Sequence, residues 1–571
     1  MVSVFSHSRR VPSPTPSRRS LVVLSALAGA ALPVLAGCDL PVVSRGKGGS
    51  ASSSRSSTTA GGSASSGSSA KAGSTDWQKL DAHIMGHKVS VEVSPVIRQD
   101  EKTSIIALRL TRAKDDASID AVVANSYNGN DNKLSISNYL GVPSIFRPGT
   151  GASLVKLLDL GSGRVWSAIN GSGLFLDLAP GEKISSFLSF GKVDSDTVTV
   201  MVPMAGFVTV SVLEADAAKK ADVNLSIAQT SLDQSSHAAP ELAAPVTIDR
   251  YTRALDDSTS TQAGGKNITV TLASDVTFAP DSADLASGAE AQIQTVADQL
   301  KQHPDGGTLT IVGHTDDVQD DAYNQTLSDK RANAVKTRLE QLTSLDKWKT
   351  SVSGKGESQP KVKGTTDQAR AANRRVEITL PPTGSTAKKG ASATPNNSGG
   401  ATLPDPQGPV AKGSEGVTLT SKGTDTSGEV IITLDHVTRT GGYLLGTITC
   451  TVKDGSTGAP LHALLEDPQT LLANQRGEDG GALPTFNASD GLTLIAGGER
   501  IFAAGYRDAD AEQHLPLTEL NVSDHLKAGI ASVCVVWPDP GGDTVILDHP
   551  EGKYSPKGTA FRLTDIPVKN S

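Results

Sequence analysis

One stretch decides how the middle of this chain folds, and it reads Thr308-Leu309-Thr310-Ile311-Val312-Gly313-His314-Thr315-Asp316. Polar and apolar residues alternate through most of it, which is typical of a β-strand with one buried face. Upstream, apolar residues in 289–300 recur at helical spacing behind a capping box formed by Ser287 and Glu290. A second helix is expected from near Asn324. Strands therefore alternate with helices between 267 and 382, and this predicts an α/β segment.

Two opposite charges are expected beside this strand. Asp316 ends the strand, and Arg331 lies between Leu327 and Val335 at spacing four on the apolar side of the second helix. A guanidinium stays charged in a protein, so Arg331 needs a negative partner, and Asp316 is well placed to be one. The pair is either a structural salt bridge or two groups that face a common groove and bind a zwitterion. By spacing alone the salt bridge is the simpler interpretation.

Further motifs follow in a fixed order. They are Gly313-His314-Thr315-Asp316, Tyr323-Asn324, Leu327-Ser328, Arg331-Ala332, Gly354-Lys355-Gly356-Glu357 and Asn373-Arg374-Arg375-Val376-Glu377. Together they resemble the OmpA-like C-terminal peptidoglycan-binding domain, over residues 266–382. This resemblance implies a small α/β (α+β) sandwich, with helices packed on one face of a mixed sheet.

The resemblance also implies a ligand, the diaminopimelate residue of the cell-wall stem peptide. In the family, the acid at the Asp316 position takes the ammonium of this residue, and the arginine at the Arg331 position takes its carboxylate. The residue types suit that role, because a planar guanidinium can hold a carboxylate with two parallel hydrogen bonds. A diamino acid that replaces diaminopimelate in other walls remains an alternative.

Four further site residues come from the same resemblance. Asn324 is expected to donate to the ligand from the start of its helix, Thr315 and Asp317 to line the rim, and Arg374 to make a secondary contact. The family commonly has a glycine three residues after the binding acid, where this chain has Gln319. The acidic loop lacks the ligand spacing of an EF-hand, so no metal site is expected.

The N-terminus has the pattern of an export signal. Arginines precede an apolar run, 21–35, which is too short to span a bilayer and ends in Leu35-Ala36-Gly37-Cys38. This ending resembles a lipoprotein lipobox and predicts a signal peptide at 1–37 and a diacylglycerol thioether on Cys38. Both the twin-arginine and the general secretory route suit the arginines. Residues 38–75 follow as a tether rich in Ser and Gly, a composition that does not form a core.

Two β-rich regions flank the central segment. Alternating runs broken by turn residues predict all-β sandwich domains at 76–254 and 415–571, and 383–414 is expected to be a disordered linker. Cys450 and Cys534 fall on predicted strands and are expected to form a disulfide in an exported protein, with two unpaired core thiols as the alternative. The fold class is thus multidomain: a central OmpA-like α/β sandwich flanked by two all-β sandwiches, with disordered linkers.

Composition and motifs limit the function. The net charge of −8 gives no positive field for nucleic acid. Zinc-protease and serine-hydrolase motifs are missing from the sequence, so neither an enzyme nor a cofactor is expected. The sequence predicts a lipoprotein on the outer face of the cell membrane, or of an outer membrane, that holds the wall non-covalently. The alternative is a surface receptor or adhesin whose β domains bind a protein or glycan and whose central domain is only a wall anchor.

Overall fold

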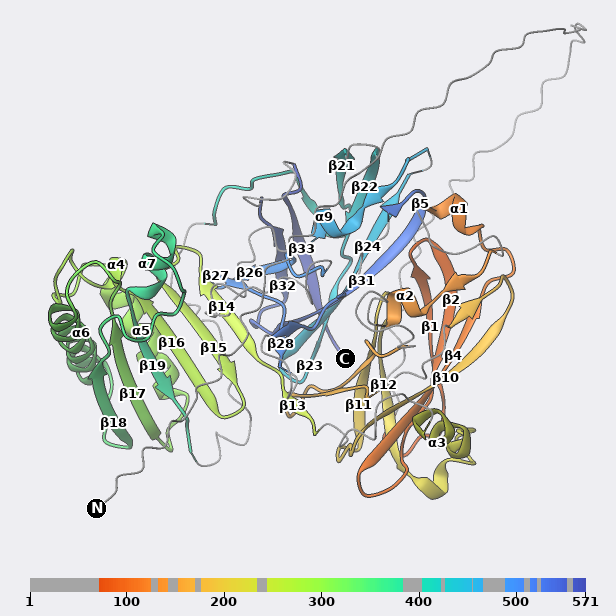
Figure 1. Ribbon diagram of the computed structural model, residues 1–571, viewed down its shortest axis with the longest axis horizontal. Coiled ribbons are helices and arrows are strands. Elements are labelled where there is room, and N and C mark those ends of the chain that lie inside the picture. Colours follow the sequence, from red (N-terminus) through yellow and green to blue (C-terminus); the bar gives the residue numbers. More distant parts are fainter. Residues whose placement is uncertain are drawn as a thin grey trace, which may run out of the picture. The chain divides into compact units, whose positions relative to one another are not determined.

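The computed structural model describes most of the chain after residue 70 (Figure 1). The described ranges are 71–124, 132–141, 152–169, 176–233, 244–383, 403–422, 427–453, 455–465, 488–507, 514–520, 525–551 and 558–571, all within one compact unit. The predicted signal peptide, the lipidation site Cys38 and the tether up to residue 70 lie outside the described residues. No helix in the described ranges is both long and apolar enough to cross a membrane.

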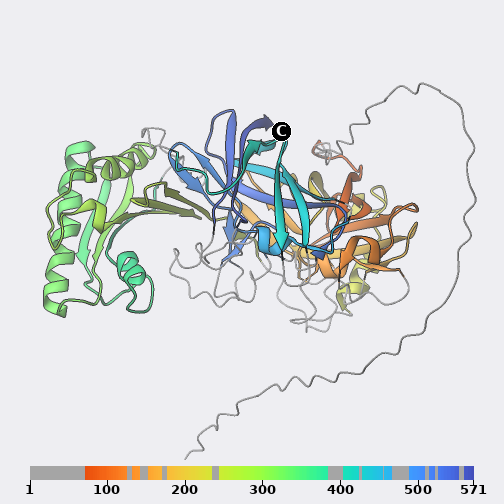
Figure 2. The same cartoon turned by 90° about the horizontal axis from the view of Figure 1, so that it is seen from above.

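Four strands form the sheet of the central segment, in the order β18-β17-β19-β16. They are β16 (Asn267–Ala273), β17 (Gly307–His314), β18 (Trp348–Gly354) and β19 (Arg375–Leu380). The β17 and β18 strands are parallel, and β19 is antiparallel to both β17 and β16. The helices are α4 (Ser274–Thr277), α5 (Ala289–Lys301), α6 (Asp321–Leu342) and α7 (Asp367–Asn373). The long helices α5 and α6 lie on one face of the sheet, as predicted (Figure 2).

The strand and helix periods explain this packing. Leu309 and Ile311 alternate on β17 and are fully buried against Val335 and Leu339 of α6 and Ile293 of α5. Each such side chain contributes about 1.5–3 kcal/mol by leaving water. The strand and the two helices each present one apolar face, and these faces form a shared core. This packing explains why the predicted helices form.

The helix starts differ in detail from the prediction. The α5 helix has Gly288 as its N-cap residue, without a side-chain cap. The predicted capping box is therefore wrong, and Glu290 binds Arg338 of α6 instead. The α6 helix begins three residues earlier than expected, because the Asp320 carboxylate accepts a hydrogen bond from the Tyr323 backbone N–H.

Most of the remaining elements are strands. Before the central segment they are β1 (Gln78–Ile84), β2 (His87–Val93), β3 (Val96–Arg98), β4 (Thr103–Arg112), α1 (Ile119–Val122), β5 (Val123–Ala124), β6 (Leu134–Ser135), α2 (Ser137–Leu140), β7 (Lys156–Asp159), β8 (Arg164–Ser167), β9 (Asp177–Leu178), β10 (Lys183–Gly191), β11 (Thr197–Val202), β12 (Gly206–Glu214), a 3-10 helix (Ala215–Ala217), α3 (Leu225–Asp233), β13 (Val246–Thr247), β14 (Arg250–Ala254) and β15 (Thr259–Gly264). After it they are β20 (Val410–Lys412), β21 (Val417–Lys422), β22 (Ser427–Thr433), β23 (Val437–Thr440), β24 (Tyr443–Val452), β25 (Ala459–Pro460), α9 (Leu461–Leu465), β26 (Thr493–Ala496), β27 (Glu499–Ile501), β28 (Gly505–Tyr506), β29 (Leu515–Pro516), β30 (His525–Leu526), β31 (Gly529–Pro538), β32 (Thr544–His549) and β33 (Phe561–Asn570).

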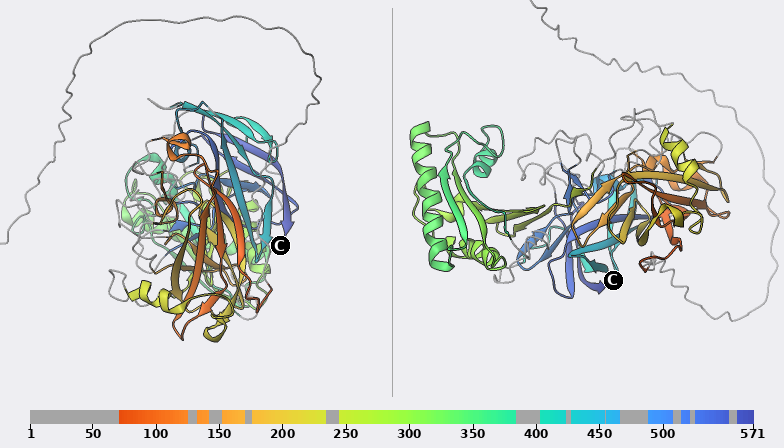
Figure 3. Two further views of the ribbon diagram at one scale, coloured as in Figure 1. Left: turned by 90° about the vertical axis from the view of Figure 1, so that its right-hand side faces the viewer. Right: turned by 90° about the horizontal axis from the view of Figure 1, so that it is seen from below.

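The two β-rich regions share one buried apolar cluster. Leu80 and Val91 of the first region belong to the same cluster as Ile448 and Val533 of the second. Short strands also cross between them, because β30 pairs with β5. The β-rich character of both regions is confirmed (Figure 3), but their separation into two independent sandwiches is not.

Two domain boundaries differ from those that the sequence predicts. The linker expected at 383–414 is too long at its C-terminal end, because β20 at 410–412 pairs in parallel with β33; residues 384–402 lie outside the described part. The β14 strand, expected to end the first sandwich, instead pairs with β15 and with β27. Through β15, β14 extends the sheet of the central segment.

The predicted disulfide does not form. Cys450 and Cys534 are free and buried on the neighbouring strands β24 and β31. In the register of this pair Cys450 faces Ala531, whereas Cys534 faces Thr447. Positions 447 and 450 are an odd number of residues apart, so the two thiols point to opposite faces of the sheet. The alternative of two unpaired core thiols is therefore correct.

Candidate functional site

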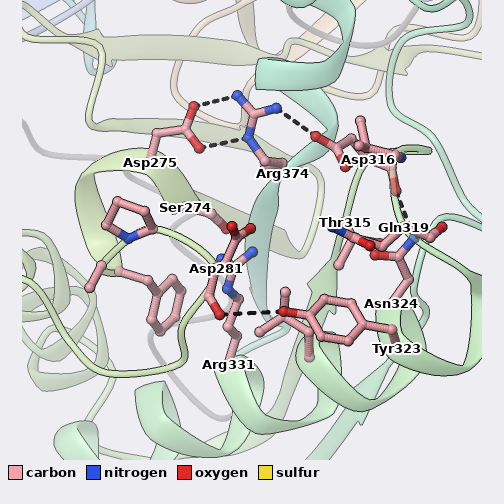
Figure 4. A pocket seen from close by; sticks show the side chains of 15 residues that line it. Ser274, Asp275, Asp281, Thr315, Asp316, Gln319, Tyr323, Asn324, Arg331 and Arg374 are labelled. Carbon is pink, nitrogen blue, oxygen red and sulfur yellow. Dashed lines mark hydrogen bonds and ion pairs between the residues drawn. The ribbon is translucent and has the colours of Figure 1, made fainter.

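A pocket of about 320 Å³ opens beside the end of β17 (Figure 4). Its wall is built from four places: the segment 274–281 after β16, the 315–319 loop, the first turns of α6, and the residue before β19. Asp316 and Arg331 both line it, together with Thr315, Asn324 and Arg374. The structure therefore brings together five of the six predicted binding residues.

Arg331 presents its guanidinium to the pocket while its stem is buried. The residue is 5% exposed, and its Nε donates to the Ser282 carbonyl at 2.9 Å. Its guanidinium carbon lies 5.2 Å from the centre of the Phe278 ring. Burial lowers the pKa of Arg331, and the nearby Asp275 and Asp281 carboxylates oppose this shift. A guanidinium nevertheless stays protonated.

The Asp316 carboxylate is held by a different arginine. Arg374 Nη1 donates to Asp316 Oδ2 at 2.6 Å, and Arg374 Nε and Nη2 donate to the two oxygens of Asp275 at 2.7 and 2.6 Å (Figure 4). Arg374 thus connects two carboxylates on opposite sides of the pocket. The bond to Asp275 is the largest cause that raises the pKa of Arg374 above its usual value.

The expected salt bridge between Asp316 and Arg331 is wrong. Among the described residues, no ion pair joins them, and Figure 4 shows them on separate parts of the pocket wall. The sequence placed both groups at the right site but assigned the wrong partner, because Arg374 lies 58 residues after Asp316. Of the two interpretations, the common groove is the one that the geometry favours.

The Asn324 amide makes its hydrogen bonds within the protein. Its amide nitrogen donates to the carbonyls of Asp316 and Gln319 at 3.1 and 2.9 Å and to Glu357 Oε2 at 2.6 Å. The amide protons are therefore used inside the protein in this structure, and donation by Asn324 to a ligand stays a prediction. Asn324 thus holds the acidic loop in place through the carbonyls of Asp316 and Gln319.

Thr315 and Asp317 differ in their position relative to the pocket. Thr315 lines the pocket, and its buried Oγ1 has no hydrogen-bond partner among the described residues. Asp317 is not part of the pocket wall, because its carboxylate is bound by Arg370 Nε at 2.7 Å. The predicted rim position is therefore wrong for Asp317.

His314, at the end of β17, does not suit a catalytic base. Its ring is buried, and burial, with the neighbouring Arg375, lowers its pKa to about 4. The imidazole is therefore neutral near pH 7 and serves as a packing group. Among the described residues, no cluster of His, Cys, Asp and Glu has the arrangement of a metal site.

The sequence reasoning missed one side of the pocket. Asp275, Phe278 and Asp281 lie in the segment between β16 and α5, and Tyr323 on α6 donates its hydroxyl to the Asp281 carbonyl at 3.5 Å. The signal available was weak, since nothing in the spacing connects 274–281 with Asp316. At the mouth, Val318 is 59% and Tyr323 40% exposed.

The comparison with protein families is decisive for this segment, because residues 277–374 match the model of the OmpA family. They form an OmpA family domain. Over 103 residues the chain is 43% identical to outer membrane porin F of Pseudomonas aeruginosa, a match that covers 18% of this chain and 29% of that protein. It is 34% identical over 119 residues to the probable lipoprotein YiaD of Escherichia coli, which covers 21% of this chain and 53% of that protein.

A solved structure also resembles the OmpA family domain. The peptidoglycan-associated lipoprotein from Burkholderia pseudomallei is 32% identical, with a TM-score of 0.17, and the match covers 18% of this chain and 86% of that one. The chain spans between about three tenths and one half of the curated relatives described above. Each of these likenesses covers about a fifth of this chain.

Proposed function

We propose that the OmpA family domain binds peptidoglycan non-covalently through the diamino acid of the stem peptide, diaminopimelate or its equivalent. One observation carries the proposal: Arg331 and Asp316 line one pocket but are not paired with each other. A zwitterion needs a fixed cation and a fixed anion at a distance, and this pocket offers both.

The guanidinium of Arg331 is prepared for a carboxylate. Its Nε is used by the Ser282 carbonyl, while among the described residues neither terminal nitrogen has a hydrogen-bond partner. Phe278 and the buried stem hold the group in place. A carboxylate that accepts from both terminal nitrogens would gain charged hydrogen bonds of about 1.5–3 kcal/mol each.

The carboxylate of Asp316 is oriented and keeps acceptor capacity. Arg374 occupies Oδ2, whereas Oδ1 receives only a long bond of 3.4 Å from the Val318 backbone N–H. The side chain is 12% exposed. An ammonium would thus find a fixed oxygen at low dielectric. The Thr315 hydroxyl, which has no hydrogen-bond partner in the described part of the chain, adds an acceptor beside it.

The chain would hold the wall to a membrane through its N-terminus. The lipobox-like sequence before Cys38 supports a lipid anchor, and the Ser/Gly-rich composition after it suits a tether. The names of the relatives, an outer membrane porin and a probable lipoprotein, support a location in the cell envelope. The proposal includes no catalytic step.

Sedimentation with purified sacculi tests this function. We expect the full chain to sediment with sacculi whose walls contain diaminopimelate, and Asp316→Ala to remain in the supernatant. Asp317→Ala is the matched control, because it removes the neighbouring carboxylate, whose partner Arg370 lies outside the pocket wall. Equal sedimentation of Asp316→Ala and the unaltered chain would exclude this pocket as the binding site.

A further inference from the structure

A second pocket, of about 330 Å³, lies on the face of the central sheet opposite α5 and α6. Its floor consists of β15, β16 and β19, whose side chains meet in cross-strand rows. Ser260, Thr271 and Glu377 form one row, and Gln262 and Thr269 belong to the next. Side chains on this face alternate with the buried apolar residues of the same strands. The floor is therefore a platform of hydroxyl, amide and carboxyl groups.

Lys361 supplies the only cation among the lining residues of this pocket. It comes from the 355–366 connection between β18 and α7. Among the described residues, none accepts a hydrogen bond from its ammonium or lies within ion-pair distance of it. Burial lowers the pKa of Lys361 to about 8, with the Glu377 carboxylate opposing and the Arg375 and Arg253 guanidinium groups adding to the shift. The ammonium is thus partly desolvated, and the Glu377 carboxylate acts on it from beyond ion-pair distance.

The two carboxylates of the pocket already have other nitrogen partners. Arg375 Nε donates to Glu377 Oε1 at 2.7 Å, and His514 Nε2 lies 2.5 Å from Asp249 Oδ2. Among the described residues, neither carboxylate forms an ion pair with Lys361. A half-buried ammonium that lines a polar cavity without a hydrogen-bonded partner in the described part of the chain is available to an anionic ligand.

We propose that this pocket binds a hydroxylated carboxylate, such as a sugar acid, with the carboxylate on Lys361 and the hydroxyl groups on the Thr, Ser and Gln side chains of the platform. The volume suits one sugar ring, at the lower end of ligand pockets. A phosphate carries about −1.5 to −2 charges near neutral pH, and Glu377 and Asp249 would repel it more strongly than a carboxylate. Because the pocket contains one ammonium and two carboxylates, it should bind a ligand with one negative charge more tightly than a ligand with two.

Isothermal titration of the full chain with D-glucuronate tests this site. D-glucose is the matched ligand, because it has the same ring without the carboxylate. We expect glucuronate to bind at least tenfold more tightly than glucose, and Lys361→Gln to remove this preference. Lys349→Gln is the control variant, since it removes the same charge from β18 of the same sheet but outside the pocket.

Two further variants keep the test decisive if Lys361→Gln does not fold. Lys361→Arg retains a cation and should keep the preference for glucuronate. Thr271→Val removes one platform hydroxyl at equal volume and should weaken glucuronate and glucose alike. Equal affinities for the two sugars, no binding of either, or an unchanged preference in Lys361→Gln would each overturn the proposal.

Discussion

Arg374 binds Asp316, with Nη1 2.6 Å from Oδ2, and the same guanidinium binds both oxygens of Asp275. This bridge connects the loop after β17 with the segment after β16, and so fixes two walls of one pocket. Arg331 lies in that pocket without joining the bridge. Arg374 is thus used within the protein, whereas Arg331 has no ion-pair partner among the described residues.

The bridge makes a stability prediction. Arg374→Gln would leave Asp275 and Asp316 without their cation, and we expect a loss of about 1 kcal/mol in the free energy of unfolding, because both ion pairs are partly exposed and screened by water. Urea denaturation measures it. Arg338→Gln, which removes an exposed ion pair between α6 and Glu290 of α5, should cost less. A larger loss in Arg338→Gln would contradict this role of Arg374.

A buried carboxyl predicts how stability changes with pH. Glu519 is fully buried and accepts hydrogen bonds from the backbone N–H groups of Met204 and Cys534, at 2.7 and 2.9 Å. Burial raises the pKa of Glu519 to about 7. The folded state therefore binds this proton more tightly than the unfolded chain, and stability decreases as the pH rises from the ordinary glutamate pKa towards 7. The full effect is at most about 3 kcal/mol.

Glu519→Gln keeps the acceptor oxygen but cannot ionise. Urea unfolding at pH 5.5 and at pH 8 should show a smaller decrease in stability for this variant than for the unaltered chain. Glu415 is an exposed glutamate of the same region. Glu415→Gln should show the same decrease in stability between pH 5.5 and pH 8 as the unaltered chain. If Glu519→Gln loses as much stability between the two pH values as the unaltered chain does, the carboxyl does not titrate in this range.

The free thiols make a chemical prediction. Cys450 and Cys534 are buried, and burial raises the pKa of Cys450 to about 12 and that of Cys534 well above its usual value. Both should resist iodoacetamide in the folded protein, since the thiolate is the reactive form. After unfolding without a reductant, peptide mass spectrometry should find both alkylated. Alkylation that requires a reductant would instead show a disulfide.

The sequence predicted the OmpA family domain well because its signals are local. Alternation around Ile311 and the helical spacing of Val335 each fix one face of one element. The same local patterns do not predict contacts between residues that are far apart in the sequence. The partner of Asp316 is Arg374, and the partner of Arg370 is Asp317, more than fifty residues away in each case.

The β-rich regions show a second limit. Period two predicted the two β-rich regions correctly, yet it does not tell which strands share a core. Leu80 and Val533 belong to one cluster although they are 453 positions apart in the sequence. The disulfide prediction failed for a related reason, because the face on which Cys534 lies depends on its register with β24.

The central claim is that Arg331 holds a carboxylate of the wall diamino acid while Asp316 holds its ammonium. Isothermal titration with two soluble stem peptides, one with diaminopimelate and one with lysine at the third position, tests it most directly, because these residues differ by one carboxylate. We expect the unaltered chain to prefer the diaminopimelate peptide by at least tenfold, and Arg331→Gln to bind both with equal, low affinity. A preference that survives in Arg331→Gln would contradict the claim.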